Sequence, residues 1–88
     1  MRLAVLSAVA LALAACTKAE MSAAREDPNG FACRQRAVVT QGVPFEETAA
    51  TRTAIDASGA ESYAVGAAGR TFRCTLDAEG FLTGFAPA

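Results

Sequence analysis

Three cysteines, Cys16, Cys33 and Cys74, place the strongest constraint on how this chain folds. The chain has 88 residues, enough for one domain and too few for a second core. Bulky core-forming side chains are scarce, with five Phe, one Tyr and no Trp. A core of this size contributes only about 3–5 kcal/mol, so the sequence predicts a covalent crosslink. The count alone leaves open which cysteines pair.

The N-terminus has the pattern of an export signal. Met1 and Arg2 give a positive start, and only Ser7 interrupts the apolar residues from Leu3 to Cys16. This run is about 14 residues long, whereas a membrane-spanning helix needs roughly 20. Its short length and small residues at the end are typical of a secretory signal. A helix packed in a folded domain is the alternative, but it would lack a polar face.

Leu13-Ala14-Ala15-Cys16 resembles the lipobox of bacterial lipoproteins. The resemblance implies that residues 1–15 are a signal peptide, that a diacylglycerol is attached to the Cys16 thiol, and that the new amino group is acylated. Ordinary signal cleavage is an alternative, since Ala12-Leu13-Ala14 has the A-x-A form. In the enterobacterial lipoproteins an Asp after the cysteine retains the protein in the inner membrane. Thr17 stands there instead, which implies an outer-membrane anchor facing the periplasm.

The lipobox resemblance also bears on the pairing of the other cysteines. Three cysteines in an exported protein leave one unpaired. If Cys16 carries lipid, Cys33 and Cys74 remain as an even pair, and we expect a disulfide between them. Loss of the signal peptide then leaves residues 16–28 as a lipidated N-terminus and flexible tether, and residues 29–88 as a small α+β domain.

The tether is polar, because residues 17–28, "TKAEMSAAREDP", contain no bulky apolar side chain except Met21. As a coil this segment would span roughly 20 Å. Its Ala, Glu and Arg content is also compatible with a loose helix.

A helix is predicted between Asp27 and Gly42. Asp27 followed by Pro28 is a typical helix start, and Gly42 before Pro44 is a typical helix end. The apolar periodicity between them is ambiguous, because a strand would also place Phe31, Cys33, Ala37 and Val39 on one face. The end signals favour the helix.

Beyond Pro44 the sequence predicts strands separated by turns. In residues 71–77, "TFRCTLD", apolar side chains alternate with polar ones, and "DAEG" predicts a tight turn with Gly80 in a left-handed conformation. "GAAGR" predicts a second turn through Gly66 or Gly69. The expected strands are residues 46–56, 61–65, 71–77 and 81–85. The fold class is therefore α+β, with one helix packed on a three- to four-stranded antiparallel meander and stapled by one disulfide.

The segments "ACRQRAV" and "TFRCTLDAEGF" also resemble a small, uncharacterised two-cysteine domain of exported proteobacterial proteins. The resemblance covers most of residues 30–85. It implies the same fold and the same disulfide, Cys33 with Cys74, and it supplies no catalytic residue.

The residue types present predict a protein that is not an enzyme. The chain has no histidine, which removes the commonest metal ligand and general base. Cys33 and Cys74 are too far apart for a C-x-x-C motif, and the pairs Glu46-Glu47 and Asp77–Glu79 are best explained as surface and turn residues. We expect no catalytic residue, no metal and no cofactor. A net charge of −1 argues against nucleic-acid binding.

Four arginines are candidate ligand-binding residues. If the disulfide brings helix and strand together, they would form a basic strip able to contact phosphates or carboxylates of the cell envelope. The alternative is an ordinary charged surface, balanced by nine acidic residues. The four are Arg34, Arg36, Arg70 and Arg73.

"SGAESY", Ser58 to Tyr63, resembles the S-G-x-x-Y loop of lipoprotein lysozyme inhibitors, although its tyrosine comes one residue too late. Turn chemistry explains the stretch better. The function predicted from sequence is therefore an outer-membrane-anchored periplasmic lipoprotein with a non-catalytic binding or structural role. The alternative is an inhibitor of a cell-wall-degrading hydrolase such as lysozyme. The expected partners are the membrane, through the lipid, and an envelope component or protein.

Overall fold

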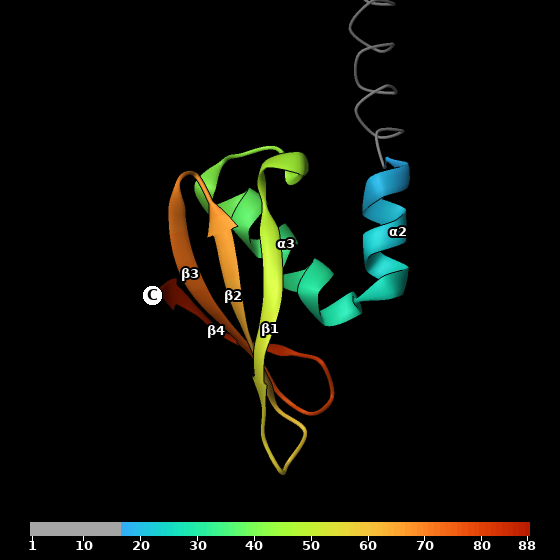
Figure 1. The fold of residues 1–88 in the computed structure, drawn as a ribbon, viewed down its shortest axis with the longest axis vertical. Coiled ribbons are helices and arrows are strands. Elements are labelled where there is room, and N and C mark those ends of the chain that lie inside the picture. The colour runs from blue at the N-terminus through green and yellow to red at the C-terminus, as the bar shows by residue number, and fades with distance from the viewer. Residues whose placement is uncertain (1–16) are drawn as a thin grey trace, which may run out of the picture.

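A computed structural model describes residues 17–88 and shows a four-stranded antiparallel sheet with a helix across one face (Figure 1). The strands follow one another in chain order, so the sheet is a simple meander. This arrangement confirms the α+β class and adds a second helix to the one expected. The elements are α2 (Lys18–Glu26), α3 (Pro28–Gln41), the 3₁₀ turn η1 (Phe45–Glu47), β1 (Ala49–Ile55), β2 (Glu61–Ala67), β3 (Arg70–Leu76) and β4 (Leu82–Pro87).

Helix α3 has the ends that its sequence predicts. The Asp27 side chain accepts a hydrogen bond from the Gly30 N–H at 3.1 Å, and Pro28 occupies the first turn, where its missing N–H costs nothing. Gly42 ends the helix with φ +66°, a conformation that glycine adopts without strain. The helix is correct and the alternative strand is not. Small buried residues, Gly30, Cys33 and Ala37, form the face of α3 toward the sheet.

The core lies between α3 and the side chains of β2 and β3 that face it. Alternation along these strands places every second residue on that face. Tyr63 pairs with Cys74 and Val65 pairs with Phe72 across the β2–β3 ladder, and all four are at most 3% exposed. Phe72 stacks on Phe85 of β4, with ring centroids 5.1 Å apart.

The first strand starts later than expected. Residues 46–56 were the predicted strand, but Glu46 and Glu47 lie in η1 and β1 begins at Ala49. Phe45 explains the difference, because its ring is 5% exposed and packs against Phe31 at 5.6 Å. Burying that ring bends the backbone into a turn before the strand can begin.

The two long hairpin loops use the same turn chemistry. The Asp56 carboxylate accepts hydrogen bonds from the backbone N–H groups of Ser58 and Ala60. The Asp77 carboxylate accepts the equivalent pair from Glu79 and Phe81. The predicted left-handed Gly80 is confirmed at φ +88°.

The turn between β2 and β3 is tighter. It passes through Ala68 (φ 55°) and Gly69 (φ 71°), as a type I′ hairpin requires. Of the two glycines considered for this turn, Gly69 is the one with positive φ, and Gly66 lies within β2.

Residues 18–26 adopt the helical alternative rather than a coil. The Thr17 hydroxyl caps α2 by accepting a hydrogen bond from the Glu20 N–H at 3.1 Å, and alanines within the helix favour it. Nine residues of helix are about 13 Å long, shorter than the coil estimate. The helix contacts α3, to which it is joined at its C-terminal end (Figure 1), but it contains no buried residue.

Candidate functional site

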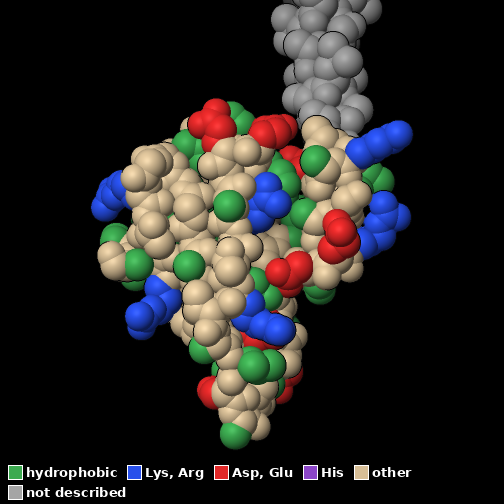
Figure 2. Space-filling model, viewed as in Figure 1, with side chains coloured by type: hydrophobic (Ala, Val, Ile, Leu, Met, Phe, Trp, Pro, Cys, Tyr) green, Lys and Arg blue, Asp and Glu red, His purple; other side chains and the backbone are tan. Residues whose placement is uncertain are grey.

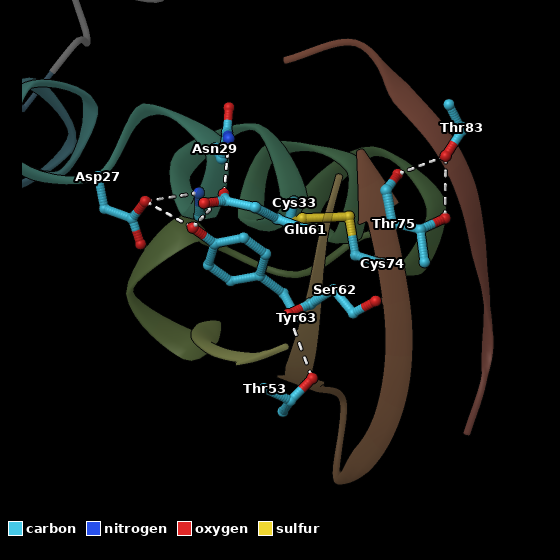
Figure 3. The surroundings of a disulfide bond; sticks show 11 residues. Asp27, Asn29, Cys33, Thr53, Glu61, Ser62, Tyr63, Cys74, Thr75 and Thr83 are labelled. Carbon is cyan, nitrogen blue, oxygen red and sulfur yellow. Dashed lines mark hydrogen bonds between the residues drawn. A yellow bond between two sulfur atoms is a disulfide. The ribbon is translucent and has the colours of Figure 1, made fainter. Parts of the chain in front are cut away.

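The disulfide predicted between Cys33 and Cys74 is present and joins α3 to the middle of β3 (Figure 3). The two Cα atoms are 5.9 Å apart, within the usual range for a bridge. Both cysteines are 0% exposed, so the bond lies inside the core. The bridge therefore has a structural role.

A polar network beside the disulfide joins the start of α3 to β2 (Figure 3). The Tyr63 hydroxyl contacts the carboxylates of Asp27 at 2.8 Å and Glu61 at 3.2 Å. The Asn29 side chain donates to the same Glu61 oxygen at 2.7 Å, and Arg52 forms an ion pair with Glu61 at 3.0 Å. Residues from α3, its cap and two strands are thus held together by shared hydrogen bonds.

The network perturbs the acid–base properties of two of its members. Burial, followed by the hydrogen bond to Asp27, raises the pKa of Tyr63. The hydrogen bond from Asn29 is the main cause that lowers the pKa of Glu61, with smaller contributions from Arg52 and Tyr63. At neutral pH the tyrosine therefore stays protonated as a donor and Glu61 stays ionised as an acceptor.

Sequence reasoning identified Asp27 as a helix cap but missed this network. Asp27 and Tyr63 are 36 residues apart in the chain, and no local pattern connects them. The one usable signal was Tyr63 itself, because a buried tyrosine hydroxyl generally requires a hydrogen-bond partner.

The stretch "SGAESY" divides between a surface turn and the core. Ser58 lies in the exposed β1–β2 loop, where its hydroxyl and N–H both donate to Asp56. Tyr63 is 2% exposed and faces α3. The tyrosine side chain is therefore not displayed in the way that the S-G-x-x-Y resemblance implies.

The Arg34 side chain is bound to η1 and to the residue that follows it. Its Nε donates to the Thr48 hydroxyl at 2.9 Å and its Nη2 to the Phe45 carbonyl at 3.1 Å. Its guanidinium carbon lies 3.7 Å from the centroid of the Phe45 ring, in cation–π range. Burial lowers the pKa of Arg34, opposed by the nearby Glu46 carboxylate.

The other three candidate arginines are exposed but lie on different surfaces. Arg36 lines a shallow groove of about 600 Å³ between α3 and Leu82 at the start of β4. Arg70 lies over the Phe72 ring, 5.6 Å from its centroid. Arg73 alternates with the buried Phe72 and Cys74 and therefore points to the opposite face of the sheet. The four arginines do not form a single strip, because strand alternation separates Arg73 from α3.

Within residues 17–88, no three His, Cys, Asp or Glu side chains come together in a group that could hold a metal ion. In the same part of the chain, no helix has both the length and the apolar character to cross a membrane. The predicted signal peptide, residues 1–15, and the predicted lipidation site, Cys16, lie outside the described residues.

Comparisons with protein-family models, with curated proteins and with solved structures gave no match for this chain.

Proposed function

We propose that the protein is a lipoprotein anchored in the outer membrane and facing the periplasm, with a non-catalytic binding or structural role. The observation that carries the proposal is the pairing of Cys33 with Cys74. This bridge accounts for two of the three cysteines, and the third is Cys16, which ends the lipobox-like Leu13-Ala14-Ala15-Cys16. Helix α2 is capped by Thr17, the residue directly after this cysteine.

The disposition of polar side chains supports a non-catalytic role. Asp27, Glu61 and Tyr63 direct their hydrogen bonds to one another and to α3. Arg34 is held by η1. These groups stabilise contacts between elements, which suits a small domain that presents a fixed surface.

Acylation is tested by expressing the full-length chain with an alkyne-bearing palmitate analogue and measuring the mass of the mature N-terminus. The expected mature protein begins with a lipid-modified Cys16 and is recovered in the outer-membrane fraction of a density gradient. The Cys16→Ser variant should lose both the lipid and the membrane association. The matched control, Cys33→Ala with Cys74→Ala, should keep the label. An uncut leader or an unmodified Cys16 thiol would refute the proposal.

The alternative role, inhibition of a wall-degrading hydrolase, is tested by titrating lysozyme with the purified mature protein. Tyr63 is buried, so the S-G-x-x-Y resemblance leaves only the exposed Ser58 loop to enter a cleft. Stoichiometric loss of lysozyme activity that disappears in Ser58→Ala would favour the inhibitor over the envelope role.

A further inference from the structure

Helix α2 has two unlike sides. Glu20, Ala23 and Ala24 are half-buried on the side that packs against α3. The helical repeat of 3.6 residues places Lys18, Met21, Ser22 and Arg25 on the opposite side, and all four are exposed. Figure 2 shows basic side chains projecting from the side of α2 that faces away from the sheet. We name Lys18, Met21 and Arg25 the outer face of α2.

The outer face of α2 is basic although the helix as a whole is neutral. Its two glutamates lie elsewhere, Glu20 on the side toward α3 and Glu26 on the flank of the last turn. The one ion pair within residues 17–88 joins Arg52 to Glu61, so Lys18 and Arg25 are both without a carboxylate partner in that part of the chain. Between the two cations, Met21 is 51% exposed. Anionic headgroups attract basic side chains near a bilayer surface, and an apolar side chain between two such cations can enter the boundary between headgroups and acyl chains.

We propose that the outer face of α2 lies on the phosphate layer of an anionic bilayer, so that α2 runs along the membrane surface. The inference rests on the proposed acylation of Cys16, which is two residues from Lys18 in the sequence. A lipid at that position holds the first turn of α2 at the bilayer. Lys18 and Arg25 then reach lipid phosphates with their charged ends, and the Met21 side chain enters the headgroup boundary.

Protein chemistry offers a direct test, because the mature lipoprotein has all three cysteines occupied. Met21→Cys therefore introduces one reactive thiol for a nitroxide label, and Ala57→Cys in the β1–β2 loop gives a matched exposed control. In phosphatidylglycerol-containing vesicles, the label at position 21 should be shielded from an aqueous nickel chelate, whereas the label at 57 should remain accessible. In vesicles of phosphatidylcholine alone, both labels should be accessible.

Charge variants test the cause of the shielding. Removal of each basic side chain should increase the ratio of exposed to shielded label at position 21 by about fivefold, so Lys18→Gln with Arg25→Gln should largely abolish it. The matched control, Arg36→Gln with Arg73→Gln, removes the same charge from other surfaces and should change nothing.

Mass spectrometry of the same samples separates the two proposals. If Cys16 carries lipid and the label at position 21 is as accessible as the label at 57, the surface orientation of α2 is wrong and the lipoprotein proposal stands. If Cys16 carries no lipid, both fail.

Discussion

Removal of the Cys33–Cys74 bridge should be the most damaging single change to the domain. The bridge spans 41 positions of the sequence. A crosslink that closes a loop of this length reduces the entropy of the unfolded chain by an amount worth about 4 kcal/mol in the simple loop model. A domain the size of residues 17–88 has a total stability of about 4–11 kcal/mol. Reduction should therefore remove a third or more of the free energy of unfolding.

The expected change is large enough to measure in two ways. For a domain of this size, each kcal/mol lowers the melting temperature by about 4–8 °C, so the reduced protein should melt roughly 15–30 °C lower. Because both cysteines are fully buried, reduction should be carried out in denaturant before refolding. Urea titrations with and without reductant, followed by circular dichroism, then give the free energies of unfolding.

A control separates the crosslink from the packing of its sulfur atoms. The reduced wild-type chain keeps both sulfurs, whereas Cys33→Ala with Cys74→Ala removes them, so the alanine variant should be less stable still. Reductant should not affect the alanine variant. If the oxidised and reduced wild-type chains unfold at the same urea concentration, the bridge does not stabilise the domain and the reasoning is refuted.

Three further predictions concern the polar network and the glycines. Tyr63→Phe should lower the free energy of unfolding by about 1.5–3 kcal/mol, the range for a hydrogen bond to a charged group. In urea titrations, a double-mutant cycle with Asp27→Asn should show coupling between the two positions. Purely additive effects of the two substitutions would contradict the contact. Because the folded pKa of Tyr63 is raised, its contribution to stability is complete below the ordinary tyrosine pKa of 10.0 and is lost as the pH rises toward the folded value. Since this is the chain's one tyrosine, ultraviolet absorbance reports its ionisation directly, and titration of the folded protein near the ordinary value would refute the network. Gly42→Ala should cost about 1 kcal/mol because of its positive φ, whereas Gly66→Ala, which has open space and no positive φ, should cost less in thermal melts.

The sequence predicted those features that local chemistry determines. The Asp27 side chain, the ring of Pro28 and the backbone freedom of Gly42 are local signals for the ends of α3. The alternation around Cys74 identified β3 and the face it buries. Features that depend on distant contacts were missed. Burial of Phe45 under Arg34 delays β1, and the Tyr63 hydroxyl is joined to Asp27 across 36 residues.

The arginines illustrate the same limit. Arg34, Arg36, Arg70 and Arg73 were grouped because helix and strand were expected to meet, as they do. Strand alternation nevertheless places Arg73 on the far face of the sheet. The guanidinium of Arg34 donates its hydrogen bonds to the Thr48 hydroxyl and the Phe45 carbonyl. Neither outcome follows from spacing along the chain alone.

The position of the disulfide also determines how the domain would respond to mechanical load. A pull applied between the N-terminus and a partner held at β4 passes through the sulfur–sulfur bond and bypasses the 40 residues between its two ends. At about 3.4 Å for each extended residue, roughly 140 Å of contour is withheld from extension. Only the residues before Cys33 and after Cys74 can lengthen, so the protein should extend much less under load than the same chain without the bridge.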